Sequence, residues 1–187
     1  MRLFLSVPLP DAVKDAVADI QSGLPEARWV APDSLHLTLR FLGQVDRGTA
    51  EDLHHALAAI RAPAFPCRVL GLGTFGTGKR VRALWAGVQD AQPFKDLHHR
   101  VEAAVRRAGL APEERKFKPH VTLARFRPGP VARLGAYLAA HEPFDGGSFT
   151  VDAFHLMESH LGHEGAHYES LAEYPLVDFF PDEAAVS

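Results

Sequence analysis

A short stretch occurs twice in the chain, and both copies have the composition of a β-strand. Residues 36–41 read HLTLRF, and residues 120–126 read HVTLARF. Because strand side chains alternate between two faces, each copy places its histidine and threonine on one face, about 7 Å apart, and its aliphatic residues on the other. The chain must therefore fold so that two such strands bury one face and leave an imidazole and a hydroxyl on the other.

The remaining elements repeat in a similar order on either side of the middle of the chain. Apolar residues at helical spacing predict helices over residues 11–22, 46–60, 92–108 and 131–140. Apolar runs bounded by Gly and Pro predict strands over residues 2–9, 35–42, 65–75, 80–88, 120–126, 149–158 and 167–175. The expected fold class is α+β: two similar lobes joined near residues 88–92, each a mostly antiparallel sheet backed by helices, packed as a single domain over residues 1–187.

Composition excludes several classes of protein. A formal net charge of −3 argues against a protein that coats nucleic acid by bulk electrostatics, although a local site for one or two phosphates is compatible with it. The single cysteine, Cys67, forms no intramolecular disulfide, and no apolar stretch approaches the roughly 20 residues of a membrane span. We expect a cytoplasmic protein whose segment after Pro181, rich in Ala and acidic residues, is frayed.

The two histidines and two threonines suit one kind of chemistry when they face each other. Imidazole titrates near pH 6.5, so one of His36 and His120 can take a proton while the other gives one. The hydroxyls of Thr38 and Thr122 can donate to the oxygens of a tetrahedral centre. This set, used without a metal, favours phosphodiester cleavage. The near symmetry of the copies leaves open which histidine is the acid.

The residues around both motifs resemble a known family. The runs LHLTLRFLG at 35–43 and KPHVTLAR at 118–125 are similar to those of the 2H phosphoesterase superfamily, and within it to the RNA 2',3'-cyclic phosphodiesterases first described as 2'-5' RNA ligases. The resemblance implies a bilobal, pseudo-twofold fold in which two sheets face a central cleft and helices cover the outer faces. It also implies hydrolysis of 2',3'-cyclic phosphate RNA ends or nucleotides to 2'-phosphomonoesters, with no metal or other cofactor.

The resemblance assigns roles that the residues alone do not. His36 would protonate the departing 3'-oxygen, His120 would activate water, and Thr38 and Thr122 would hold phosphate oxygens. Phe41 and Arg125, each five positions after a histidine, would flank the substrate, Phe41 by stacking on a base and Arg125 near the phosphate or base. Strict alternation points both toward the core, so each strand must bulge or end before them.

Alternation also places Arg40 on the face of His36 and Thr38, at the cleft edge. The basic residues Arg115, Lys116 and Lys118 precede the second motif and either steer an RNA backbone toward it or belong to a solvated loop.

Other residues receive structural interpretations. His160, His163 and His167, with Glu158 and Glu164, match no strong zinc pattern, so we expect no metal site and an exposed loop over residues 159–165. Trp29 and Trp85 are expected in the core, and His98 and His99 on a solvated helix flank.

Two rival functions use the same residues. A 2'-5' RNA ligase would join tRNA halves by the reverse reaction, and an RNA-end-binding module would have only incidental catalysis. Neither a membrane partner nor an obligate protein partner is indicated.

Overall fold

The computed structural model describes residues 1–177 of the 187-residue chain. The expectation of a frayed segment after Pro181 lies outside the described residues. The helices are α1 (Asp11–Ala18), α2 (Arg47–Ala58), α3 (Gln92–Arg107) and α4 (Leu134–Ala140). The strands are β1 (Arg2–Pro8), β2 (Ala27–Trp29), β3 (His36–Gln44), β4 (Phe65–Phe75), β5 (Ala83–Val88), β6 (Val121–Phe126), β7 (Asp145–Val151), β8 (Ala153–Gly162) and β9 (Gly165–Pro175).

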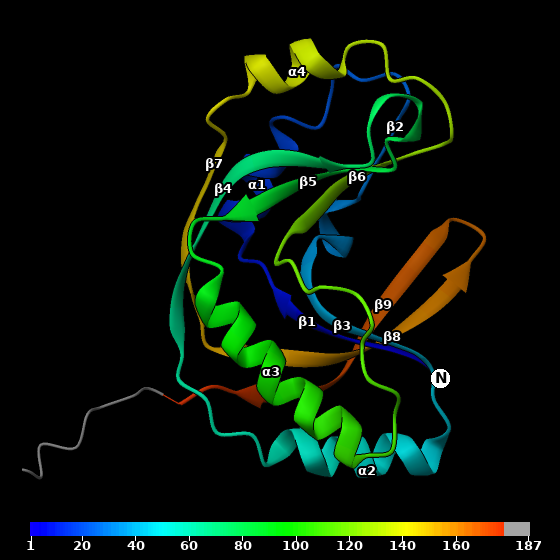
Figure 1. Cartoon of the computed structure of the whole chain (residues 1–187), viewed down its shortest axis with the longest axis vertical. Coiled ribbons are helices and arrows are strands. Elements are labelled where there is room, and N and C mark those ends of the chain that lie inside the picture. The colour runs from blue at the N-terminus through cyan, green and yellow to red at the C-terminus, as the bar shows by residue number, and fades with distance from the viewer. Residues whose placement is uncertain (178–187) are drawn as a thin grey trace, which may run out of the picture.

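The strands form one nine-stranded antiparallel sheet in the order β7-β4-β5-β6-β3-β1-β8-β9, with β2 paired to β6 (Figure 1). The pairing of β3 with β6, at Leu37 opposite Val121, joins the half β7-β4-β5-β6 to the half β3-β1-β8-β9. The predicted α+β class with antiparallel pairing is confirmed. The two expected sheets are thus two halves of one strongly bent sheet.

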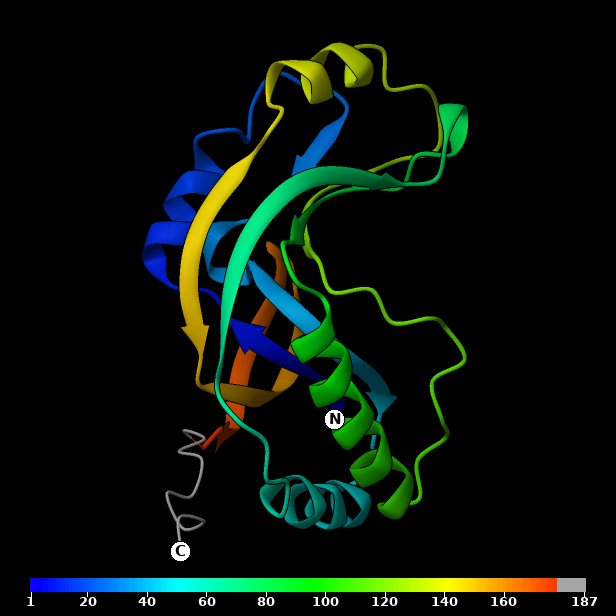
Figure 2. The same cartoon turned by 60° about the vertical axis from the view of Figure 1, so that its left-hand side comes forward.

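The two halves of the sheet are not the two halves of the sequence. The expectation of a junction near residues 88–92 is wrong, because β8 and β9 come from the end of the chain and extend the half that begins with β1 and β3. Helix α3 packs against β3 and α2, whereas α1 packs against β7 on the outer side of the other half (Figure 2). The chain therefore crosses between the halves several times, which ties them together.

Strand β7 was not expected as a separate strand from the sequence. The expected strand over residues 149–158 covers the end of β7 and the start of β8, which Asp152 separates. The run Asp145-Gly146-Gly147 resembles a turn, yet it pairs with β4, and a Cβ on Gly146 would lie only 2.9 Å from Val69. Glycine is thus used here for close approach of two strands.

The β8–β9 hairpin also differs from expectation. The strands continue to Gly162 and resume at Gly165, so the expected loop over residues 159–165 is only a two-residue turn.

The core lies between the sheet and its helices. Helix α3 buries one face, and its Phe94 is fully buried with its ring edge-to-face against Phe65 at 4.9 Å. Among residues 1–177, no helix is both long and apolar enough to cross a membrane.

Replacing Phe94 by Ala should lower the free energy of unfolding by about 3–5 kcal/mol, because it removes a large buried side chain and leaves a cavity. Phe41→Ala is the matched control, since its side chain is 61% exposed. It should change stability by less than about 0.5 kcal/mol. Urea unfolding followed by circular dichroism measures both. Equal losses in the two variants would contradict this description of the core.

Candidate active site

The pairing of β3 with β6 brings the two motifs side by side. Leu37 and Val121, the residues directly after the two histidines, lie opposite each other and are both buried. Continuing this antiparallel register by one residue places His36 across from Thr122, and Thr38 across from His120, on the other face of the sheet. This face is called the histidine face below. All four polar side chains are partly exposed there, and the charge of His120 acts on the pKa of His36.

Both strands bulge at the third residue after the histidine. Thr38 pairs with Ser6 and Arg40 with Leu5, which leaves Leu39 without a partner on β1. In β6 the corresponding residue is Leu123, which is skipped between the pairs of Thr122 and Ala124 with β5. Its carbonyl instead accepts hydrogen bonds from the backbone N–H of Val30 at 2.9 Å and from Gln21 Nε2 at 3.2 Å.

The bulges reverse the alternation and return Phe41 and Arg125 to the exposed side. Phe41 is 61% exposed and its ring lies 6.1 Å from that of Phe4, which also contacts His36. Arg125 is exposed, and its charge lowers the pKa of both His36 and His120. The conditional prediction that both strands must bulge is confirmed. The bulge also makes the expectation for Arg40 wrong, because it turns this side chain into the interior.

Hydrogen bonds fix the tautomer of each imidazole. His36 Nδ1 lies 2.7 Å from the carbonyl oxygen of Ser34, and His120 Nδ1 lies 2.6 Å from that of Lys118. A carbonyl only accepts, so Nδ1 carries a proton in both rings, and in each neutral ring Nε2 is the nitrogen that can accept one. His36 Nε2 lies 2.9 Å from the Thr38 hydroxyl. Within residues 1–177, Nε2 of His120 has no hydrogen-bond partner.

Each imidazole packs against two aromatic side chains. The His36 ring lies 5.0 Å from Phe4 and 5.4 Å from Tyr168, the latter edge-to-face. Neither aromatic neighbour was identified from the sequence, because Tyr168 arrives from β9, far along the chain from His36.

On the other half of the sheet, the His120 ring lies 4.9 Å from Phe75, edge-to-face, and 6.2 Å from Trp85. Trp85 is partly exposed, not in the core as expected, and Lys118 Nζ lies 4.3 Å from its ring centroid. Because Trp85 is directly across from Thr122 in the β5–β6 register, its side chain is on the histidine face.

The pKa of both histidines is lowered from the ordinary value of 6.5. For His36 the main cause is burial, with smaller contributions from the charges of Arg125 and His120, opposed by the Ser34 carbonyl. For His120 burial again dominates, followed among the lowering effects by the charges of Lys118 and Arg125. Both rings are therefore mostly neutral at pH 7 in the free protein.

A pocket opens beside His36. It is lined by polar side chains from four elements, among them Ser6, Lys14, Asp33 and His155, and by Tyr168. A negatively charged or sugar-like group that reaches His36 would meet donors and acceptors here.

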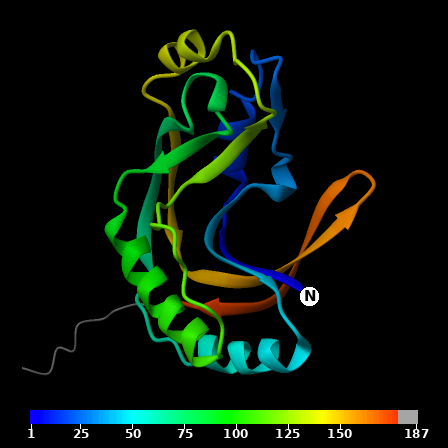
Figure 3. The same cartoon turned by 45° about the vertical axis from the view of Figure 1, so that its right-hand side comes forward.

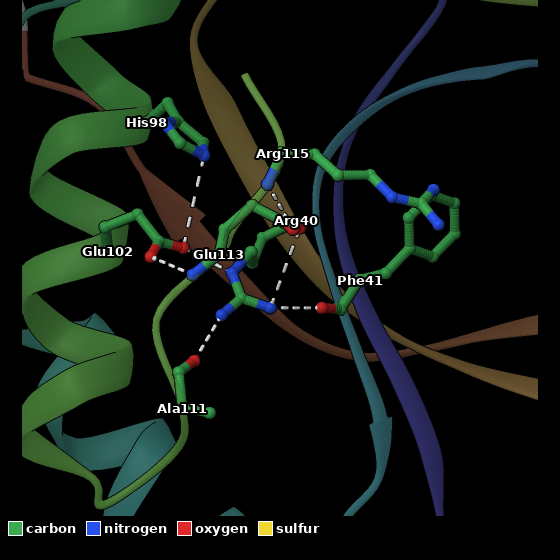
Figure 4. Close-up of polar contacts among 7 residues, drawn as sticks. All are labelled: Arg40, Phe41, His98, Glu102, Ala111, Glu113 and Arg115. Carbon is green, nitrogen blue, oxygen red and sulfur yellow. Dashed lines mark hydrogen bonds and ion pairs between the residues drawn. The ribbon is translucent and has the colours of Figure 1, made fainter. Parts of the chain in front are cut away.

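A buried ion network supports the bulge in β3 (Figure 4). Arg40 is only 8% exposed and donates to the Glu102 carboxylate on α3, to the Phe41 carbonyl and to the Ala111 carbonyl. Glu102 also accepts from the backbone N–H of Glu113 at 3.1 Å. Arg40 thus holds the backbone of Phe41 and, on the other side, the loop that leads to His120.

The same loop is fixed at a second point. Phe117 stacks on His98 with ring centroids 4.2 Å apart and planes 3° from parallel, so His98 is not the solvated residue expected. Arg115, Lys116 and Lys118 remain exposed on this anchored segment.

The chain is similar to a family model, to several named proteins and to solved structures. It matches the model of the 2'-5' RNA ligase superfamily over residues 9–163. A Geobacillus stearothermophilus protein named RNA 2',3'-cyclic phosphodiesterase is 32% identical over 93% of this chain, which spans only 57% of that relative's length. A Thermus thermophilus protein of the same name is 35% identical over 94% of this chain and 90% of its own. The solved structure of E. coli LigT complexed with 3'-AMP has a TM-score of 0.80 and 28% identity, covering 95% of this chain and 98% of that one.

Arg40→Ala should destabilise the protein by about 3–5 kcal/mol, because it removes a buried guanidinium and leaves the carboxylate of Glu102, only 17% exposed, without its ion-pair partner. Arg47→Ala is the matched control, since Arg47 forms an exposed pair with Glu51 on α2. Its cost should stay below about 0.5 kcal/mol. Denaturant unfolding measures both values. A loss at Arg40 no larger than at Arg47 would show that the network does not hold the loop.

Proposed function

The chain belongs to the 2'-5' RNA ligase superfamily, and we propose that it hydrolyses 2',3'-cyclic phosphate ends of RNA to 2'-phosphomonoesters with protein groups alone. The observation that carries the proposal is the placement of two imidazoles and two threonine hydroxyls on adjacent strands of one sheet. The named relatives are RNA 2',3'-cyclic phosphodiesterases, and LigT holds a nucleotide, which supports the same substrate class here.

In the proposed reaction His120 is the general base and His36 the general acid. Nε2 of His120 takes a proton from water as the water oxygen bonds to phosphorus. Nε2 of His36 gives its proton to the 3'-oxygen as the P–O3' bond breaks, and the phosphate stays on the 2'-oxygen. Thr38 and Thr122 donate to the non-bridging oxygens, and the Arg125 guanidinium offsets their charge. Phe41 stacks on the terminal base.

An asymmetry between the half-sites supports this assignment. The free Nε2 of neutral His120 is ready to accept a proton from water, whereas Nε2 of His36 is engaged by Thr38. An anionic phosphate placed between the rings raises the pKa of both imidazoles, because an opposite charge favours the protonated form. The substrate thus supplies the charge that allows one of the two neutral rings to become protonated, and in the proposed reaction this ring is His36.

We propose that residues 1–187 act as one domain of two pseudo-symmetric lobes, since the histidine face needs strands from both. We also propose a cytoplasmic setting, which suits a chain whose single cysteine is a buried free thiol.

His36→Ala and His120→Ala should each lower kcat for a 2',3'-cyclic nucleotide by about 10²–10⁴-fold, the usual contribution of general acid–base catalysis. The assay contains EDTA, and chromatography identifies the product as the 2'-phosphate. His99→Ala is the control, because His99 is exposed on α3 and should leave kcat unchanged. Full activity in either active-site variant, or activity only with added metal, would overturn the proposal. In ligation a 5'-hydroxyl would replace water as the group that His120 deprotonates, so joining of cyclic-phosphate tRNA halves by the same variants tests this alternative.

The pH dependence should reveal the lowered pKa values. The active form needs neutral His120 and protonated His36, so kcat/KM should follow a bell whose maximum lies between the two pKa values of the free enzyme. Since both pKa values lie below 6.5, the maximum should fall below about pH 6.5. The maximum of kcat should lie at higher pH, because the bound phosphate raises the pKa of the acid.

Arg125→Gln removes a positive charge that disfavours protonation of both rings, so it should move the kcat/KM profile to higher pH. Arg127→Gln, two positions along and also exposed, should leave the profile in place. A kcat/KM maximum above pH 7 in the wild type would contradict the account of both histidines.

A further inference from the structure

The β8–β9 hairpin extends away from the body of the protein and carries side chains that the proposed reaction does not use. In Figures 1 and 3 its tip lies apart from the helices and from β3 and β6. Leu161 near the turn is 79% exposed. Side chains on its two strands follow strict pairing, from Glu158 opposite Glu169 to Gly162 opposite Gly165.

Four of these residues lie close together, and three of them could share one ion. Glu158 and His160 are two positions apart on β8, and they lie directly opposite Glu169 and His167 on β9. His160 Nε2 lies 3.2 Å from Glu169 Oε2 and 3.7 Å from Glu158 Oε2. One ligand atom from each of Glu158, His160 and Glu169 lies within 4.8 Å of the other two. The ring centroids of His160 and His167 are 6.3 Å apart, and the ring planes differ by 28°.

The charges of this group are poorly balanced. Carboxylates directly opposite each other on adjacent strands repel. Among residues 1–177, the only basic group within 4.0 Å of either Glu158 or Glu169 is the imidazole of His160. The Glu158 side chain is only 18% exposed, so water screens its charge less than that of a free surface carboxylate. A bound cation would remove this repulsion.

We propose that the hairpin binds one divalent transition-metal ion of the Zn²⁺ type through Glu158, His160 and Glu169, with the fourth position of a tetrahedral shell left to water. Imidazole nitrogen with carboxylate oxygen is a ligand set that suits Zn²⁺ and its neighbours, whereas Mg²⁺ prefers oxygen alone in an octahedral shell. The expectation of no metal site rested on spacing along the chain. Spacing does not reveal this group, because Glu169 comes from the opposite strand.

The ion would not contact the proposed catalytic residues, but β9 would link its site to His36. Tyr168 sits between His167 and Glu169, so its side chain points to the opposite face, where it contacts His36 and Phe4. The metal would hold in place the strand that positions Tyr168. Binding of the ion does not depend on the proposed reaction, and only this link to His36 rests on it.

Isothermal titration of the metal-free full-length protein with ZnCl₂ tests the site. The chain has 11 histidines, so the comparison of variants, not binding alone, locates the ion. His160→Ala and the double variant Glu158→Gln/Glu169→Gln should each weaken the binding of one equivalent at least tenfold. His163→Ala is the matched control, because His163 lies in the turn of the same hairpin and outside the cluster. It should bind like the wild type, and MgCl₂ should give no heat of binding at the same concentrations.

His36→Ala should also keep the site, which separates it from zinc held between the active-site imidazoles. Circular dichroism of each variant checks that the fold is intact. The proposal is overturned if wild type binds no zinc at micromolar concentrations, if His160→Ala binds as tightly as wild type, or if His163→Ala loses the ion equally. Each of these results is independent of whether the protein hydrolyses cyclic phosphates.

Discussion

The pairing of β3 with β6 is the contact on which the active site depends. It is short, with Leu37 opposite Val121, yet it sets the positions of all four motif side chains at once. Both paired residues are fully buried, so the hydrophobic core fixes the register, and a slip of either strand by one residue would turn its aliphatic residues out to solvent. Each strand alone carries one histidine and one threonine of the proposed site, and the pairing of the two strands brings the four side chains together.

The bulges in β3 and β6 bring two further side chains to the face of the sheet that carries the histidines. Bulges at Leu39 and Leu123 return Phe41 and Arg125 to the histidine face, and each bulge has its own support. The Leu123 carbonyl is bonded by Gln21 and the backbone of Val30, whereas the chain after Leu39 is held by Arg40. A buried arginine pair is a costly way to fix a strand, because both charges must be desolvated. Its benefit is that one guanidinium holds β3, α3 and the loop before His120 together.

The sequence predicts the parts of the structure that rest on local patterns. Leu37 and Leu39 alternate with His36 and Thr38. This two-residue alternation alone predicts that the segment is a strand and which of its faces is buried. The β7 strand was missed because its first residues, Asp145-Gly146-Gly147, are residue types typical of turns. Their presence in a strand is explained by the close approach of Gly146 to Val69. Tyr168 and Trp85 were missed as neighbours of the histidines for a different reason. Each reaches its imidazole from another strand, and no pattern within one segment records such a contact.

The two histidines have similar backbone settings but different side-chain neighbours. The motif strands share register, bulge position and a carbonyl on each Nδ1, so the backbone treats the two histidines alike. Their surroundings do not. His36 is held by the Thr38 hydroxyl and lies beside Tyr168 and a polar pocket, whereas His120 lies beside Trp85 under the charge of Lys118. A nearby cation keeps an imidazole neutral and suited to accept a proton, and under the proposed function a ring that meets an anionic phosphate beside a hydroxyl and a polar pocket is suited to give one. The symmetric strands therefore set the relative positions of the two imidazoles, and the proposed assignment of base and acid rests on their asymmetric neighbours.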